Sequence, residues 1–153
     1  MPKKKKYYDI SNLLKTKAQY MILLGQRANG KSYQAKLTVL TDAYEHNRWF
    51  VYLRRYDADI KAKSVEAYFA DMNIEEITHH EYDRIIAWSG VIYFGLVNDN
   101  GEIVKGPEIG RYCALNKYDR YKSQMFVDFD WILYEEFITD SAYLPDEPRQ
   151  LQQ

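Results

Sequence analysis

The eight residues from Gly25 to Ser32 constrain this chain more than any other feature of its sequence. They read Gly-Gln-Arg-Ala-Asn-Gly-Lys-Ser, which fits the phosphate-binding pattern G-x-x-x-x-G-K-[ST] without a mismatch. A short apolar run at residues 19–24 precedes them, and a helical spacing of apolar residues begins at Lys31. A loop that curls from a buried strand into a helix N-terminus aims several backbone N–H groups at one phosphate. The segment therefore predicts a binding site for ATP and Mg²⁺.

Each residue of this loop has an expected role. Lys31 would bridge the terminal phosphates and take part in catalysis, and the Ser32 hydroxyl would be a ligand of Mg²⁺. The glycines would permit the backbone angles and the close approach of the phosphates. The residues expected to contact the nucleotide are Gly25, Gln26, Arg27, Ala28, Asn29, Gly30, Lys31 and Ser32.

A pair of acidic residues, Glu135 and Glu136, directly follows the apolar run Trp131–Tyr134. An acid at the end of a buried strand can hold Mg²⁺ and its water shell, and a second acid beside it can polarise an attacking water. We therefore assign Glu135 to the metal and Glu136 to the general base. The metal position more often holds Asp, and Glu is one methylene longer. No guanine-reading Asn-Lys-x-Asp follows, and paired acids suit hydrolysis better than phosphorylation of a small molecule.

The composition fits one domain, at residues 18–153, behind a basic arm at residues 1–17. The chain has 153 residues, of which 46% are hydrophobic and 28% charged, enough for one core. The arm carries six lysines against one aspartate. The single cysteine, Cys113, excludes an internal disulfide framework, and no apolar run approaches the length of a membrane span.

The order of apolar patterns predicts an α/β fold with a mostly parallel sheet flanked by helices. A helical turn is expected at residues 10–15, and Asn116 is expected to cap a later helix at residues 116–122. The other predicted helices cover residues 31–44 and 62–72, and the predicted buried strands cover residues 19–24, 49–53 and 131–134. Strand–helix–strand order favours parallel pairing with right-handed crossovers.

Residues 84–115 have a different pattern, which predicts an antiparallel insertion in this sheet. Asn98–Gly101 is a strong hairpin signal, and Gly106–Pro107 is expected to break the chain between two strands. The predicted strands of the insertion cover residues 84–88, 91–97, 102–105 and 111–115.

Three segments together resemble the small DNA-packaging ATPases of tailed phages, the phi29-type encapsidation proteins. They are Gly25–Tyr33, Tyr121–Ser123 and Ile132–Phe137. The resemblance covers roughly residues 18–140. It implies a P-loop NTPase fold of the additional-strand (ASCE, RecA-like) class. It also implies a homo-oligomeric ring around double-stranded DNA, attached to a capsid portal or connector in the host cytoplasm.

The resemblance also bears on three further residues. Arg27 in the loop is expected to be catalytic, and Tyr33 to contact the nucleotide. Lys122 lies thirteen residues before Glu135, where the family also places a Lys-Ser pair. A strand of about seven residues spans roughly 23 Å, so Lys122 is expected to be far from its own Glu135. We therefore expect it to reach the nucleotide of a neighbouring subunit.

Two other functions are consistent with this sequence. One is a P-loop phosphotransferase acting on a small molecule, and the other is a nucleotide-binding assembly module without efficient turnover. Only seventeen residues follow Glu136, so the ATPase domain is expected to be incomplete at its C-terminus and weakly active alone. Lys105, Arg111 and Lys117 are candidates for nonspecific contacts with a DNA backbone.

Overall fold

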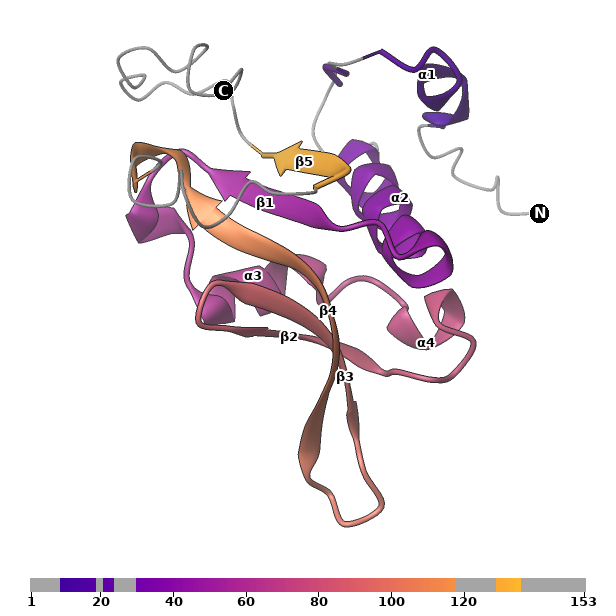
Figure 1. Cartoon of the computed structure of the whole chain (residues 1–153), viewed down its shortest axis with the longest axis vertical. Helices are drawn as coiled ribbons and strands as arrows, with labels where there is room; N and C mark the ends of the chain where they lie inside the picture. The colour runs from indigo at the N-terminus through magenta and orange to yellow at the C-terminus, as the bar shows by residue number, and fades with distance from the viewer. Residues whose placement is uncertain (1–8, 19–20, 24–29, 118–128, 136–153) are drawn as a thin grey trace, which may run out of the picture.

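The structure is a computed structural model that describes residues 9–18, 21–23, 30–117 and 129–135. Within these ranges, one mixed sheet of five strands has the order β2-β3-β4-β1-β5. The strands are β1 (Phe50–Arg54), β2 (Arg84–Trp88), β3 (Val91–Val97), β4 (Ile103–Ala114) and β5 (Trp131–Tyr134). The helices are α1 (Ser11–Leu14), α2 (Lys31–His46), α3 (Ala62–Phe69) and α4 (Ile74–Ile77), with 3-10 turns η1 (Asp57–Asp59) and η2 (Leu115–Lys117). Figure 1 shows β3 and β4 reaching beyond the rest of the sheet as a long hairpin.

Strand β1 is an interior strand of the sheet and joins its two parallel pairings. It pairs in parallel with β4 on one side and with β5 on the other. Its side chains alternate between the two faces of the sheet, and both faces are covered, since Phe50 and Val51 are each 0% exposed. A strand buried on both faces explains why this part of the sequence is a continuous apolar run.

The main core lies between one face of the sheet and helices α2, α3 and α4. Its members with almost no exposure include Leu40, Phe50, Val65, Phe69, Ile92 and Phe94. On the other face, a small second cluster contains Val51, Leu53 and Cys113. Burial raises the pKa of the Cys113 thiol to about 12, so the thiol stays protonated at neutral pH.

Several elements confirm the sequence prediction. Strands β2, β3 and β5 have the predicted bounds, β1 is displaced by one residue, and α1 and α2 form where helices were expected. Helix α3 ends at Phe69, so Met72 lies beyond it. The antiparallel part is also confirmed, because β2, β3 and β4 pair antiparallel. With two parallel and two antiparallel pairings among the described strands, however, the sheet is mixed rather than mostly parallel.

The predicted buried strand at residues 19–24 is not seen in the part that the structure describes. Met21–Leu23 have no strand conformation, and Ile22 is 64% exposed, while residues 19, 20 and 24 lie outside the described ranges. A strand is held by hydrogen bonds to a neighbour, and β5 pairs with β1 alone among the described strands. Strand β5 is therefore an edge strand here, and its Ile132 is 51% exposed rather than buried.

The predicted break at Gly106–Pro107 is wrong, because β4 runs through it as one strand of 12 residues. Tyr93 pairs with Glu108 and Gly95 with Lys105, so the one residue between them on β3 lies opposite two residues of β4, Gly106 and Pro107. This bulge leaves Gly106 and Pro107 without register partners, so the missing N–H of proline costs no ladder hydrogen bond. Beyond the bulge, β4 pairs with β1.

The chain after β4 also differs from expectation. Only the turn η2 forms in the described part of the predicted helix at residues 116–122, and residues 118–122 lie outside the described ranges. The Asn116 side-chain Oδ1 accepts a hydrogen bond from the Asp57 N–H at 3.2 Å, which joins this turn to η1. No helix among the described residues is long and apolar enough to cross a membrane.

Gly110 of β4 lies opposite Phe50 of β1 and gives the first prediction. An added Cβ would lie 2.2 Å from the Phe50 carbonyl oxygen, which belongs to the backbone and cannot turn away. We expect Gly110→Ala to lower the free energy of unfolding by about 3 kcal/mol, measured by urea denaturation. Gly101→Ala is the control. Its Cβ meets nothing within 4 Å, so only its φ of +78° should cost stability, about 1 kcal/mol. Equal losses would contradict the pairing of Gly110 with Phe50.

Candidate functional site

Helix α2 begins where the phosphate-binding pattern predicts a helix N-terminus. Gly30 precedes it with φ 86° and ψ 8°, a left-handed conformation that glycine adopts without a steric penalty. The Gly30 carbonyl accepts the N–H of Gln34 at 3.0 Å, so the helical hydrogen bonds start at once. Lys31 and Ser32 therefore occupy the first turn, where the helix dipole favours a negatively charged group.

Glu135 is brought to this helix by strand β5. Its backbone N–H donates to the Leu53 carbonyl at 3.4 Å, which carries the pairing with β1 one residue past the end of the strand. The Ser32 hydroxyl donates to Oε2 of Glu135 at 3.4 Å. The structure thus places together the two residues that the sequence assigns to Mg²⁺, although they are 103 positions apart.

The other carboxylate oxygen of Glu135 has a partner that the sequence reasoning missed. The Tyr68 hydroxyl, from α3, donates to Oε1 of Glu135 at 2.6 Å. The Tyr68 ring stacks on that of Tyr52, with ring centroids 4.5 Å apart and planes inclined by 9°. Burial and the charge of Glu135 raise the pKa of the Tyr68 phenol far above its ordinary value. Tyr68 is therefore a hydrogen-bond donor at neutral pH.

Lys36 is the second residue that the sequence reasoning missed. It lies one helical turn after Ser32 and is only 5% exposed. Its ammonium donates to the Tyr68 carbonyl at 2.8 Å, forms an ion pair with Asp71, and lies 4.6 Å from the centroid of the Tyr68 ring. Lys36 therefore ties α2 to α3 beside Glu135. Lys36 precedes Leu40 by four residues and so lies on the apolar face of the helix. A lysine on such a face is the sequence signal that could have identified it.

The paired side chains fit the metal that the sequence predicts. A serine hydroxyl and a carboxylate supply oxygen ligands, which Mg²⁺ prefers. Ser32 and Glu135 would hold the ion, with the Tyr68 hydroxyl on the second oxygen of Glu135.

Other predicted site residues are placed differently or lie outside the described ranges. Tyr33 packs against the main core. Lys117 forms an ion pair with Asp57 at 2.6 Å, and the Lys105 ammonium lies 4.1 Å from the centroid of the Trp88 ring. The predicted site residues outside the described ranges are Gly25, Gln26, Arg27, Ala28, Asn29, Lys122 and Glu136.

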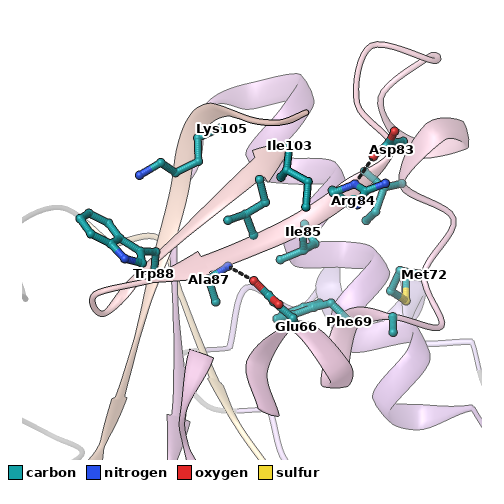
Figure 2. Close-up of a pocket in the computed structure, with 13 residues that line it drawn as sticks. Glu66, Phe69, Met72, Asp83, Arg84, Ile85, Ala87, Trp88, Ile103 and Lys105 are labelled. Carbon is teal, nitrogen blue, oxygen red and sulfur yellow. Dashed lines mark hydrogen bonds and ion pairs between the residues drawn. The ribbon is translucent and has the colours of Figure 1, made fainter. Parts of the chain in front are cut away.

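A separate groove of about 610 Å³ lies between α3 and the antiparallel strands. Figure 2 shows Trp88 and Asp83 at its opposite ends. Its acidic groups are engaged, because Glu66 accepts the Ala87 N–H at 3.0 Å and Asp83 pairs with Arg84. None of the residues that line the groove belongs to the site around Ser32 and Glu135.

The fold and the site together define a mixed α/β domain in which a Gly-Lys-Ser helix start faces a glutamate at a strand end. The chain belongs to the podovirus DNA encapsidation protein (Gp16) family, whose sequence profile matches residues 2–153. This match confirms the resemblance to phi29-type encapsidation proteins.

Two relatives show how much of such a protein the chain represents. It is 27% identical over 128 residues to the DNA packaging protein of Bacillus phage B103, which covers 82% of this chain and 35% of the relative. It is 24% identical over 144 residues to that of Bacillus phage phi29, which covers 92% of this chain and 39% of the relative. The chain thus spans between a third and two fifths of the length of these relatives.

Solved structures show the same fold. The chain is similar to the crystal structure of the N-terminal domain of the DNA packaging ATPase from bacteriophage phi29. The TM-score is 0.76 at 24% identity, and the match covers 95% of this chain and 69% of that one. It is also similar to a chain of the phi29 viral genome packaging motor assembly. There the TM-score is 0.72 at 21% identity, covering 95% of this chain and 41% of that one.

The buried ammonium of Lys36 gives the second prediction. Lys36→Ala removes its contacts with Tyr68 and Asp71 and the packing of its aliphatic stem. We expect the free energy of unfolding to fall by about 2 kcal/mol, measured by urea denaturation. Lys63→Ala, on the exposed side of α3, is the matched control and should change it by less than about 0.5 kcal/mol. Similar values for the two variants would show that Lys36 does not hold the helices together.

Proposed function

We propose that this chain is the ATP-binding part of a subunit of a viral DNA-packaging motor, which uses ATP hydrolysis to move double-stranded DNA into a procapsid. The observation that carries the proposal is the contact between Ser32 and Glu135, from the two segments that the sequence assigns to nucleotide chemistry. Membership of the DNA encapsidation family supports the packaging role. The assignment of the fold to the P-loop NTPase class is also part of this proposal.

The described side chains have distinct tasks in this function. The N-terminus of α2 and the Lys31 ammonium bind and orient the terminal phosphates. Ser32 and Glu135 would hold Mg²⁺, and the Tyr68 hydroxyl donates to the second oxygen of Glu135. When bound, Mg²⁺ would neutralise charge on the phosphates.

The remaining roles are proposed from the sequence and the family. Arg27 acts on the phosphates from within the loop, and Glu136 takes the proton of the attacking water. Lys122 acts on the nucleotide of a neighbouring subunit in a homo-oligomeric ring. The ring surrounds DNA, contacts its backbone nonspecifically, and docks on the capsid portal in the host cytoplasm. The similarity to a chain of a genome packaging motor assembly supports a place for this chain in such an assembly.

The third prediction concerns nucleotide binding. Lys31→Ala removes a cation from the first turn of α2, so the affinity for ATP with Mg²⁺ should fall by about 10- to 100-fold. Isothermal titration of the 153-residue chain measures this change. Lys63→Ala, which removes a lysine from an exposed helical position, should keep the parent affinity. An unchanged affinity for ATP in the Lys31→Ala variant would show that the nucleotide does not bind at this loop.

The fourth prediction tests the motor function in the assembled ring. Double-stranded DNA should stimulate ATP hydrolysis. Glu136→Gln should reduce hydrolysis by about 10²–10⁴-fold while ATP still binds, because an amide cannot take a proton from water. Glu135→Ala should instead weaken Mg²⁺-dependent binding of ATP.

Two other outcomes would favour a different function. Transfer of phosphate to a small-molecule acceptor without stimulation by DNA would favour a phosphotransferase. ATP binding without turnover by the assembled parent would favour an assembly module.

A further inference from the structure

The two carboxylate oxygens of Glu135 have different partners. Oε2 accepts a hydrogen bond from Ser32 at 3.4 Å, and Oε1 accepts one from Tyr68 at 2.6 Å. The bond from Tyr68 is the shorter of the two and joins a neutral donor to a charged acceptor, which makes it strong. The orientation of the carboxylate is therefore set more by α3 than by α2.

Tyr68 is itself held from two sides. Tyr52 of β1 stacks on its ring, and Lys36 of α2 contacts both its ring and its carbonyl oxygen. These contacts involve neither Glu135 nor a ligand. The position of the phenol is therefore determined by the packing of α2, α3 and β1, and the hydroxyl is aimed at Glu135 before anything binds.

We propose that Tyr68 is a positioning residue of the metal site, whose hydroxyl holds Oε1 of Glu135 so that Oε2 faces the Ser32 hydroxyl. This inference rests on the nucleotide function proposed above. Tyr68 touches neither metal nor nucleotide in this role; it acts through Glu135. It is distinct from a core aromatic residue, whose hydroxyl could be removed without an effect on metal binding.

The length of the glutamate side chain explains why such a residue is needed. Compared with Asp, Glu has one more rotatable bond, and a ligand with free bonds loses more conformational entropy when it binds a metal. A fixed donor on one oxygen removes part of that freedom in advance. Partners of this kind, which orient a metal ligand, typically contribute about 10- to 100-fold in metal affinity.

The fifth prediction uses Tyr68→Phe, which removes the hydroxyl and keeps the stacked ring. Titrate ATP into the 153-residue chain in EDTA and at increasing MgCl₂. The affinity for ATP in EDTA should stay within about twofold of that of the parent chain. Mg²⁺ increases the affinity for ATP, and the Mg²⁺ concentration that gives half of this increase should rise about tenfold in the variant. Tyr44→Phe is the matched control, because Tyr44 donates to Glu81 at 2.9 Å, in a Tyr–Glu bond outside the site. It should leave both values unchanged.

A second measurement tests the contact without ligand. Urea unfolding in EDTA is compared for Tyr68→Phe, Glu135→Ala and the double variant. Each variant is expected to raise the equilibrium constant of unfolding by some factor. If the hydroxyl and the carboxylate interact, the factor for the double variant should be smaller than the product of the factors for the two single variants. A rise equal to the product would overturn the inference.

The outcomes separate this inference from the proposed function. A parent chain that binds ATP with Mg²⁺, together with a Tyr68→Phe variant that has the same Mg²⁺ requirement, overturns the role of Tyr68 and leaves the nucleotide function intact. A parent chain that binds ATP in neither condition overturns the nucleotide function and the role of Tyr68 with it. An equal loss of affinity with and without Mg²⁺ would show that Tyr68 is only structural.

Discussion

The parallel pairing of β1 with β5 is the interaction on which the candidate site depends. Among the described strands, β5 has β1 as its one neighbour, and the pairing of Leu53 with Tyr134 is followed by the hydrogen bond from Glu135. Trp131, Leu133 and Glu135 alternate with outward residues and so share the face toward α2. A slip of one residue would turn Glu135 to the opposite face of the sheet, away from Ser32.

A second anchor sets the position of α2 along β5. The Trp131 indole N–H donates to Oδ2 of Asp42 at 2.8 Å, while Ser32 contacts Glu135. The ten residue steps from Ser32 to Asp42 rise about 15 Å in a helix, and the four steps from Trp131 to Glu135 span about 13 Å in a strand. These lengths agree, so helix and strand can be joined at both ends. The N-terminus of the helix consequently lies at the carboxyl end of the strand, where α/β proteins place their ligand sites.

The sequence predicted the proximity of residues that stand in recognisable local patterns, and it missed contacts that depend on tertiary packing. Ser32 and Glu135 stand in recognisable patterns, a glycine-rich helix start and an acid after an apolar strand, so their proximity could be anticipated. Tyr68 has no local signal, because its role comes from contacts with three other elements. At residues 21–23, the described part of the predicted strand at 19–24, the apolar run has no strand conformation: such a run shows what can be a strand, whereas a strand also needs a paired neighbour.

The contact between Tyr68 and Glu135 also links the stability of the fold to the chemistry of the site. The Tyr68 phenol is partly buried against the main core, and a hydroxyl removed from water is stabilised by an acceptor. Glu135 supplies this acceptor, and Tyr68 in return restricts the motion of Glu135. The carboxylate is thus a structural partner of α3 as well as a candidate ligand. Its identity is therefore constrained by the core of the protein even where no metal is bound.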